Sequence, residues 1–259
     1  MDQVAQIQGR EINDIFLPTA NIFVPILETK QADIQATKKE TYQYGPTERH
    51  KLDVYYPPKT PTSGHPHILF FSHGGGFYVG SRSLLAPADI IDSNLGAFFS
   101  KRGFITVIPC GLGDAPPGAM NMFTLLVLPD LYSPSLHPRI KGAILLAGPY
   151  TFEDIPVDMK DAVRLYYGEV KGTIPLELLH LAKDDAVLFR RWSLGIAERD
   201  FPCLTPALEK FKEALTKKGV LFDEFVAKGH NHVSVLALET GQGEEWAEGV
   251  VNWIRAAPA

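Results

Sequence analysis

Short apolar runs alternate along the chain with longer stretches of mixed polarity, and this pattern predicts strands and helices in turn. The runs expected to form strands are 52–56, 67–72, 104–108, 140–147, 194–197 and 221–227. The stretches expected to be helical are 84–101, 158–188, 206–218 and 244–255. Strands that alternate with helices predict one α/β domain over residues 1–259, with a mainly parallel sheet covered by helices on both faces.

Two of the expected strands differ in the exposure that their patterns predict. Residues 52–56 alternate in polarity and stop at Pro57-Pro58, which favours an exposed hairpin strand at the edge of the sheet. Residues 67–72 are nearly all apolar and stop close to three consecutive glycines. This pattern favours a strand that is buried on both faces of a parallel sheet.

The segments outside this alternation predict smaller features. Pro18 and Pro25 interrupt residues 1–40, so we expect an N-terminal arm of short helices there. Residues 158–188 are a candidate for a small cap, although packing of their aromatic residues in the core is an equally good interpretation. No segment of about 20 to 50 residues repeats, which excludes solenoid architectures.

Composition and charge exclude several classes of function. The 259 residues are 45% hydrophobic and 21% charged, as in ordinary globular proteins. The formal net charge is −5 without a basic stripe, so neither nucleic acid nor an anionic membrane is an expected partner. The apolar runs are far shorter than the roughly 18 residues of a membrane span. Because Cys110 and Cys203 cannot build a disulfide framework and the acidic start is unlike a secretion signal, we expect a cytoplasmic location.

Residues that follow the carboxyl ends of parallel strands are the candidates for chemistry, because ligands bind at that edge of the sheet. The segment His73-Gly74-Gly75-Gly76-Phe77 follows the apolar strand, and glycines let backbone N–H groups turn toward a developing oxyanion. Asp200 follows a later strand, and His230 and His232 follow the last one. Each is unremarkable alone, but a glycine loop, an aspartate and a late histidine occur in the chain order of α/β-hydrolases.

The chain resembles the esterase and lipase group of α/β-hydrolases that carry an HGGG oxyanion loop, in particular its intracellular carboxylesterase, feruloyl or acetyl esterase-like and kynurenine-formamidase-like branch. The resemblance covers most of the chain and rests on the HGGG loop and on Tyr44-Gly45-Pro46, Leu52-Asp53-Val54-Tyr55-Tyr56-Pro57 and Asn94-Leu95-Gly96-Ala97-Phe98-Phe99. It implies an α/β-hydrolase fold and the hydrolysis of a small-molecule ester or, alternatively, of a formamide. It also implies an oxyanion hole formed by Gly75 and Gly76, within the motif that begins with His73 and Gly74.

The same resemblance implies roles for the two polar strand ends. Asp200 corresponds to the acid of the catalytic triad, and His232 corresponds to the general base. His230 is the less favoured base, because the family pattern has an apolar residue directly after the catalytic histidine, as Val233 follows His232.

The serine nucleophile of this group is missing from the sequence. The family carries it in G-x-S-x-G, on a strained turn between a strand and a helix, and no such motif occurs here. The helix after this turn corresponds to residues 118–126, which puts Pro116 at the position of the serine. Proline has neither a hydroxyl nor an N–H group. Cys110 is the best substitute, although a small apolar residue is its better interpretation, and no elbow-like context surrounds Ser72, Ser81, Ser133 or Ser135.

The length of the same region also indicates a missing segment. Only a few residues separate the strand end near Pro109 from the elbow-derived segment, which begins by about Asp114. A parallel crossover requires at least about 10 to 12 residues, and a central strand requires roughly 5 or 6 more. We therefore expect the fold to lack one crossover helix and the central strand that carries the nucleophile.

Three hypotheses follow from these observations. The chain is a catalytically impaired member of a serine esterase family, a non-catalytic binding protein of the same fold, or a splice variant or gene-model product. The third explains the origin of the missing segment and is compatible with the first. No cofactor and no metal are expected, because His65, His67 and His73 lack a carboxylate or cysteine at ligand spacing.

Overall fold

The computed structural model of the chain describes residues 1–48, 50–59, 66–72, 74, 90–109, 123, 126–127, 136–167, 174–182 and 191–257. Its strands are β1 (Lys39–Gln43), β2 (Lys51–Tyr55), β3 (Ile68–Phe70), β4 (Ile105–Pro109), β5 (Gly142–Leu146), β6 (Arg191–Arg199) and β7 (Phe222–Asn231). Its helices are α1 (Asp2–Ala5), α2 (Ile12–Thr29), α3 (Gln31–Gln35), α4 (Ile90–Lys101), α6 (Val157–Tyr167), α7 (Pro175–Leu181), α9 (Leu204–Lys217) and α10 (Glu245–Arg255). Short 3-10 turns are η2 (His137–Arg139) and η3 (Ser234–Leu236).

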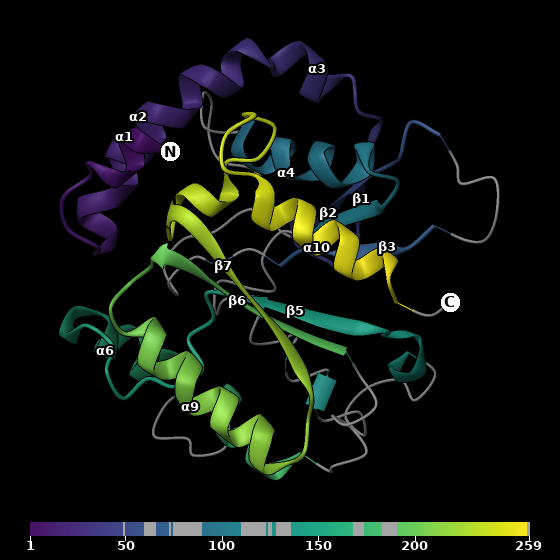
Figure 1. Ribbon diagram of the computed structural model, residues 1–259. Coiled ribbons are helices and arrows are strands. Elements are labelled where there is room, and N and C mark those ends of the chain that lie inside the picture. Colours follow the sequence, from purple (N-terminus) through teal and green to yellow (C-terminus); the bar gives the residue numbers. More distant parts are fainter. Residues whose placement is uncertain are drawn as a thin grey trace.

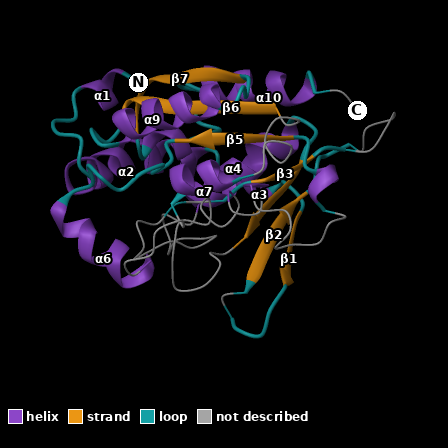
Figure 2. Ribbon diagram, turned by 90° about the horizontal axis from the view of Figure 1, so that it is seen from below, coloured by secondary structure: helices purple, strands orange, loops and turns teal. Residues whose placement is uncertain are grey.

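The described strands form two sheets. The first has the order β1-β2-β4-β3, in which only β3 and β4 run parallel, and the second is the fully parallel sheet β5-β6-β7. Figures 1 and 2 show helices packed on both sides of the strands. The predicted α/β class is therefore confirmed, including its parallel βαβ unit of β3, α4 and β4.

One helical layer packs against both sheets. Helices α4 and α10 supply most of a buried cluster that includes Phe98, Phe99 and Val251. Leu69 from the first sheet and Ile144 from the second pack against that same cluster. β3 lies at the end of one sheet and β5 at the end of the other, and no strand pairing between described residues joins them. This shared apolar layer therefore connects the two sheets.

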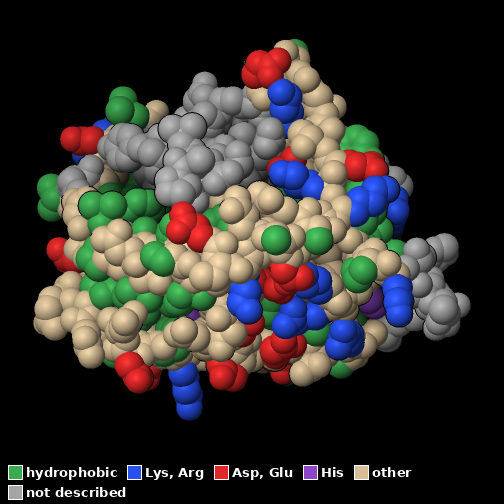
Figure 3. All heavy atoms as spheres, turned by 90° about the horizontal axis from the view of Figure 1, so that it is seen from above, with side chains coloured by type: hydrophobic (Ala, Val, Ile, Leu, Met, Phe, Trp, Pro, Cys, Tyr) green, Lys and Arg blue, Asp and Glu red, His purple; other side chains and the backbone are tan. Residues whose placement is uncertain are grey.

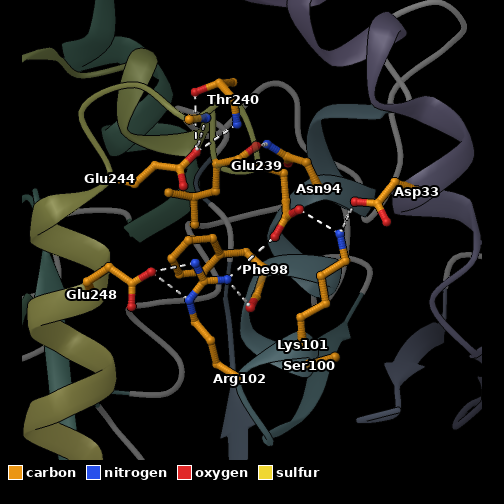
Figure 4. Close-up of polar contacts among 12 residues, drawn as sticks. Asp33, Asn94, Phe98, Ser100, Lys101, Arg102, Glu239, Thr240, Glu244 and Glu248 are labelled. Carbon is orange, nitrogen blue, oxygen red and sulfur yellow. Dashed lines mark hydrogen bonds and ion pairs between the residues drawn. The ribbon is translucent and has the colours of Figure 1, made fainter.

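An ion-pair network ties the same two helices at the surface of this layer (Figure 4). Arg102, directly after α4, bonds to the carboxylate of Glu248 on α10, donates to the carbonyl of Phe98 and stacks over the Phe98 ring. Lys101 bridges Asp33 of α3 and Glu239, with 2.6 Å between its Nζ and each carboxylate. The bond from Arg102 keeps the pKa of Glu248 below its ordinary value.

The opposite face of the parallel sheet carries its own core. Phe211 of α9 stacks on Tyr150 with 4.3 Å between ring centroids and contacts Phe123. Trp192 of β6 and Leu179 of α7 are fully buried in this cluster. The second sheet is therefore covered on both faces.

The exposure of two strands differs from the prediction. β2 lies inside its sheet between β1 and β4, and Asp53, Val54 and Tyr55 are buried, so β2 is not an edge strand. The edge position belongs to β1, whose polar sequence gave no strand signal. β3 is not buried on both faces, because Ile68 and Phe70 are 58% and 53% exposed. Among the described strands it pairs with β4 alone, and its side chains are less buried than its apolar composition predicts.

The prediction of short helices in the N-terminal arm is also wrong. Helix α2 continues for 18 residues through both Pro18 and Pro25. Its buried side chains recur every four residues, from Ile15 to Thr19, Phe23 and Leu27, so one continuous face packs against the domain. This burial compensates for the backbone hydrogen bonds that the two prolines cannot form.

The described surface mixes charges of both signs. On the face seen in Figure 3, lysine and arginine side chains lie next to aspartate and glutamate. Among the described residues, none of the helices combines the length and the apolar character that a bilayer crossing requires.

Arg102→Met tests the role of the α4–α10 network. The substitution keeps the stem over Phe98 but removes the partly buried ion pair, so we expect a loss of about 1 to 2 kcal/mol in the free energy of unfolding, measured in urea. The matched control is Lys210→Met, which removes an exposed pair with Glu153 and should cost about 0.5 kcal/mol or less. Equal losses would contradict a special role for Arg102.

Candidate active site

Two neighbouring strands of the parallel sheet bring an aspartate and a histidine together. Asp200 follows β6 directly, and His232 follows β7 directly. Because these strands run parallel, their carboxyl ends lie at the same edge of the sheet. The distance from Asp200 Oδ1 to His232 Nδ1 is 2.7 Å.

An irregularity in β7 contributes to this placement. Ala197 pairs with Ala227, but two residues later on β6, Arg199 pairs with Asn231. The two extra residues on β7 form a bulge, and Gly229 within it adopts a φ of +75° that favours glycine. Its N–H donates to the Glu198 carboxylate at 2.7 Å. The bulge therefore places Asn231 opposite Arg199, so that His232 lies beside Asp200.

The Asp200 carboxylate is fully buried and has every hydrogen bond it needs. Its Oδ2 accepts the N–H of Ala197 at 3.1 Å, and its Oδ1 accepts the N–H of Phe201 at 2.9 Å. The third bond is the one to His232. A buried carboxylate held by three donors has one orientation, and that orientation presents Oδ1 to the imidazole.

The same bond determines the tautomer of His232. An ionised carboxylate only accepts hydrogen bonds, so Nδ1 carries the proton and Nε2 keeps its lone pair. The ring stacks on Phe201 with 4.1 Å between centroids, and its side chain is 31% exposed. This arrangement gives a partly accessible base whose orientation is fixed by an acid and an aromatic ring.

His230, the alternative base, lies in a different environment. Its ring is fully buried, with Nε2 2.6 Å from the carbonyl of Gly243 and Nδ1 3.0 Å from Ser234 Oγ. Because a carbonyl only accepts, Nε2 donates to Gly243, and Nδ1 accepts from the serine hydroxyl. Both ring nitrogens are therefore engaged within the protein, and burial lowers the pKa of His230.

The positions proposed for the oxyanion hole are described only in part. Gly74 is exposed, and a Cβ added there would meet no atom of the described residues within 4 Å. The other members of the HGGG motif, His73, Gly75 and Gly76, lie outside the described residues.

The candidate nucleophile positions also fall mostly outside the described residues, which include neither Pro116 nor Cys110, nor Ser81, Ser133 and Ser135. From the expected elbow helix, Phe123 and Leu126 are described, and both are buried in the core beneath the second sheet. Cys203 forms no disulfide, and burial raises the pKa of its thiol, which lowers its nucleophilicity at neutral pH.

Sequence reasoning missed the residues that hold the pair in place. Phe201 stacks on His232, and Thr19, Asn231 and Ser234 form a buried polar cluster behind the histidine. Thr19 lies 212 positions before Asn231, and no motif links the two. The position of Phe201 next to Asp200 was the one available signal.

Comparisons with known proteins identify the fold of this chain. No known family profile matches the sequence, and no curated protein sequence matches it. Solved structures do match: esterase Est22 has a TM-score of 0.65 at 12% identity over 99% of this chain and 92% of that one. Esterase B from Lactobacillus rhamnosis has 0.63 at 11% identity over 93% and 94%. The chain has the α/β-hydrolase fold.

A fungal esterase from Rhizomucor miehei shares this α/β-hydrolase fold at a TM-score of 0.56 and 17% identity, over 92% of this chain and 90% of that one. At such identities the likeness concerns the fold. In an α/β-hydrolase fold, ligands bind beyond the carboxyl ends of the strands, and that edge carries Asp200 and His232.

The buried His230 predicts a pH dependence of stability. Its folded pKa lies below the ordinary value of 6.5, chiefly through burial, with the Met1 amino group acting in the same direction and Glu245 opposing it. Between the two pKa values the unfolded chain binds more protons, so stability is present above about pH 6.5 and is lost as the pH falls. We expect the free energy of unfolding to fall by up to about 1.4 kcal/mol per pH unit in this window.

The control is His230→Gln, which does not titrate and keeps an amide donor toward Gly243. Urea unfolding between about pH 5 and pH 8 should give this variant a lower but flatter stability curve. An unchanged slope would assign the pH dependence to other groups.

Proposed function

We propose that this chain belongs to a family of serine carboxylic ester hydrolases that act on small-molecule esters, and that the chain itself is catalytically impaired. The observation that carries the proposal is the Asp200–His232 pair, at 2.7 Å, on the strand-end edge of a fold shared with several esterases. An acid that fixes the tautomer of a histidine is the arrangement that activates a hydroxyl nucleophile.

Each residue has a defined part in this proposal. His232 Nε2 would take the proton from an attacking hydroxyl and return it to the leaving group, while Asp200 stabilises the imidazolium. The backbone N–H groups of Gly75 and Gly76 would bind the oxyanion of the tetrahedral intermediate. The attacking hydroxyl is the part that the sequence lacks, with Pro116 at its expected position.

The arrangement of the described strands in two sheets is the one expected if a central strand is absent. The first sheet ends at β3 and the second begins at β5, and the chain passes from β4 to β5 through the region where the sequence is short. One further parallel strand between β3 and β5 would join the two into a continuous sheet. The exposure of Ile68 and Phe70 on β3 is consistent with such a neighbour being missing.

A non-catalytic binding role is the second candidate. Such a role requires a stable fold, and packing on both sides of the short region favours it. Phe123, Leu126 and Val127 are buried after that region, and Ile108 is buried before it. A small acyl compound is the ligand class expected for the remaining pocket, and a ligand-dependent rise in melting temperature would support this role.

Activity assays test the impairment. Loss of a nucleophile lowers kcat by roughly six orders of magnitude in a serine hydrolase, so we expect no turnover of p-nitrophenyl acetate above that of His232→Ala. We also expect no covalent label from a fluorophosphonate. A stoichiometric label would refute the impairment, and loss of that label in Cys110→Ala would identify the thiol as the substitute nucleophile.

The family assignment has a separate test, which is sequencing of the native transcript across the codons for Phe104 to Phe123. An in-frame insert that encodes a helix, a strand and G-x-S-x-G is the expected result. The longer protein should then take the fluorophosphonate label and hydrolyse small esters, with an aryl formamide tested beside them. If the transcript contains no insert, the esterase assignment fails for this chain and the binding role replaces it.

A further inference from the structure

We propose that Thr19 of α2 is a positioning residue for His232 and acts through Asn231. The inference rests on the proposed role of His232 as the general base. The proposal makes helix α2 part of the site, since the Thr19 hydroxyl would determine how firmly the His232 imidazole is held against Asp200.

The link between the two segments is a single buried hydrogen bond. Asn231 Nδ2 lies 2.8 Å from Thr19 Oγ1, and both residues are 2% exposed. An amide nitrogen only donates, so the threonine oxygen is the acceptor. Among the described residues, Thr19 Oγ1 is the one acceptor bonded to Asn231 Nδ2, and water has little access to this bond.

The other end of the same amide closes a turn around the histidine. Asn231 Oδ1 accepts the N–H of Val233 at 3.0 Å and the N–H of Ser234 at 2.9 Å. These two N–H groups belong to the residues directly after His232, so the amide spans the histidine. A side chain that caps its own turn in this way fixes the direction of the backbone within it.

A second set of bonds closes the turn from the opposite side. Ser234 Oγ accepts the N–H of Asn231 at 2.9 Å and contacts His230 Nδ1, and the other nitrogen of His230 donates to Gly243. Residues 230–234 therefore behave as one hydrogen-bonded unit. Side-chain bonds attach this unit to its surroundings through Thr19, Gly243 and Asp200.

Packing places α2 where a change in that bond would reach the site. Ile15 and Phe23 are buried in a cluster against which Phe201 and Val233 also pack, and these two flank Asp200 and His232 in sequence. Arg199, before Asp200, donates to the carbonyls of Ala5 and Ile7. In Figure 1, α1 and α2 lie on the side of the molecule where β6 ends.

Removal of the hydroxyl should loosen the turn without unpacking the helix. Thr19→Val keeps the volume but leaves the amide donor of Asn231 buried without an acceptor, which is costly. The amide can recover a partner only by rotating, and rotation breaks its bonds to Val233 and Ser234. His232 then leaves Asp200 for part of the time.

The tautomer of His232 measures this effect without any enzymatic activity. Imidazole ¹⁵N chemical shifts of the full chain at about pH 8 distinguish Nδ1–H from Nε2–H. The His232 signals are assigned by their loss in His232→Gln. Asp200→Asn provides the reference spectrum of a His232 ring without its carboxylate partner. The native chain should show Nδ1–H. Loss of one buried hydrogen bond should raise the Nε2–H population of Thr19→Val roughly tenfold.

Two variants separate positioning from general destabilisation. Thr19→Ser retains the acceptor and should restore the native tautomer. Ile15→Val removes one methyl group from the same buried face of α2, so it weakens packing but leaves the polar link intact. An unchanged tautomer in Thr19→Val, or an equal shift in Ile15→Val, overturns the proposal.

A third variant covers the case in which Thr19→Val fails to fold. Thr19→Ala removes the same acceptor and lacks the second methyl group that valine places beside Asn231 Nδ2, so it breaks the link to α2 with less crowding. The same rise in Nε2–H is expected, and its absence counts against the proposal. If the positioning role of Thr19 is wrong, the His232 tautomer stays unchanged in these variants. If the proposed function is wrong, the protein encoded by the longer transcript lacks esterase activity.

Discussion

The packing of α4 and α10 across both sheets is the constraint on which the rest of the structure depends. The described strands form two sheets, and no strand pairing within the described part of the chain joins β3 to β5. The apolar layer around Phe98 and Val251 makes that connection, since side chains from both sheets pack on it. Arg102 and Glu248 add a charged bond between the same helices. Nonpolar burial, which needs no strand register, holds the two parts together.

The Asp200–His232 pair belongs entirely to one of these parts. Its acid follows β6, its histidine follows β7, and the core beneath them is built around Trp192 and Phe211. The polar unit behind the histidine is bonded to α2. The described bonds that hold the pair come from β6, β7 and the residues directly after them. Under the proposed function, a chain without the serine would still hold Asp200 and His232 in place.

Local patterns were sufficient for much of this architecture. Apolar periodicity predicted α9 and α10, and the largely buried strands β4 and β6 follow from nearly continuous apolar runs. The run at 221–227 predicted β7, although β7 lies at the end of its sheet and several of its side chains are exposed. The pairing of an aspartate with a late histidine also follows from order along the chain, because parallel strand ends meet at one edge. These features depend on neighbours in sequence or on topology alone.

The features that could not be predicted depend on distant partners. Helix α2 passes through Pro18 and Pro25 because its buried face packs against residues more than two hundred positions away, including Ala237. Thr19 has no feature in the sequence that marks it, and its significance comes from an amide that reaches it across 212 positions. β3 has the composition of a central strand and the exposure of an edge strand. That mismatch between sequence and burial is what our proposal of a missing neighbouring strand would explain.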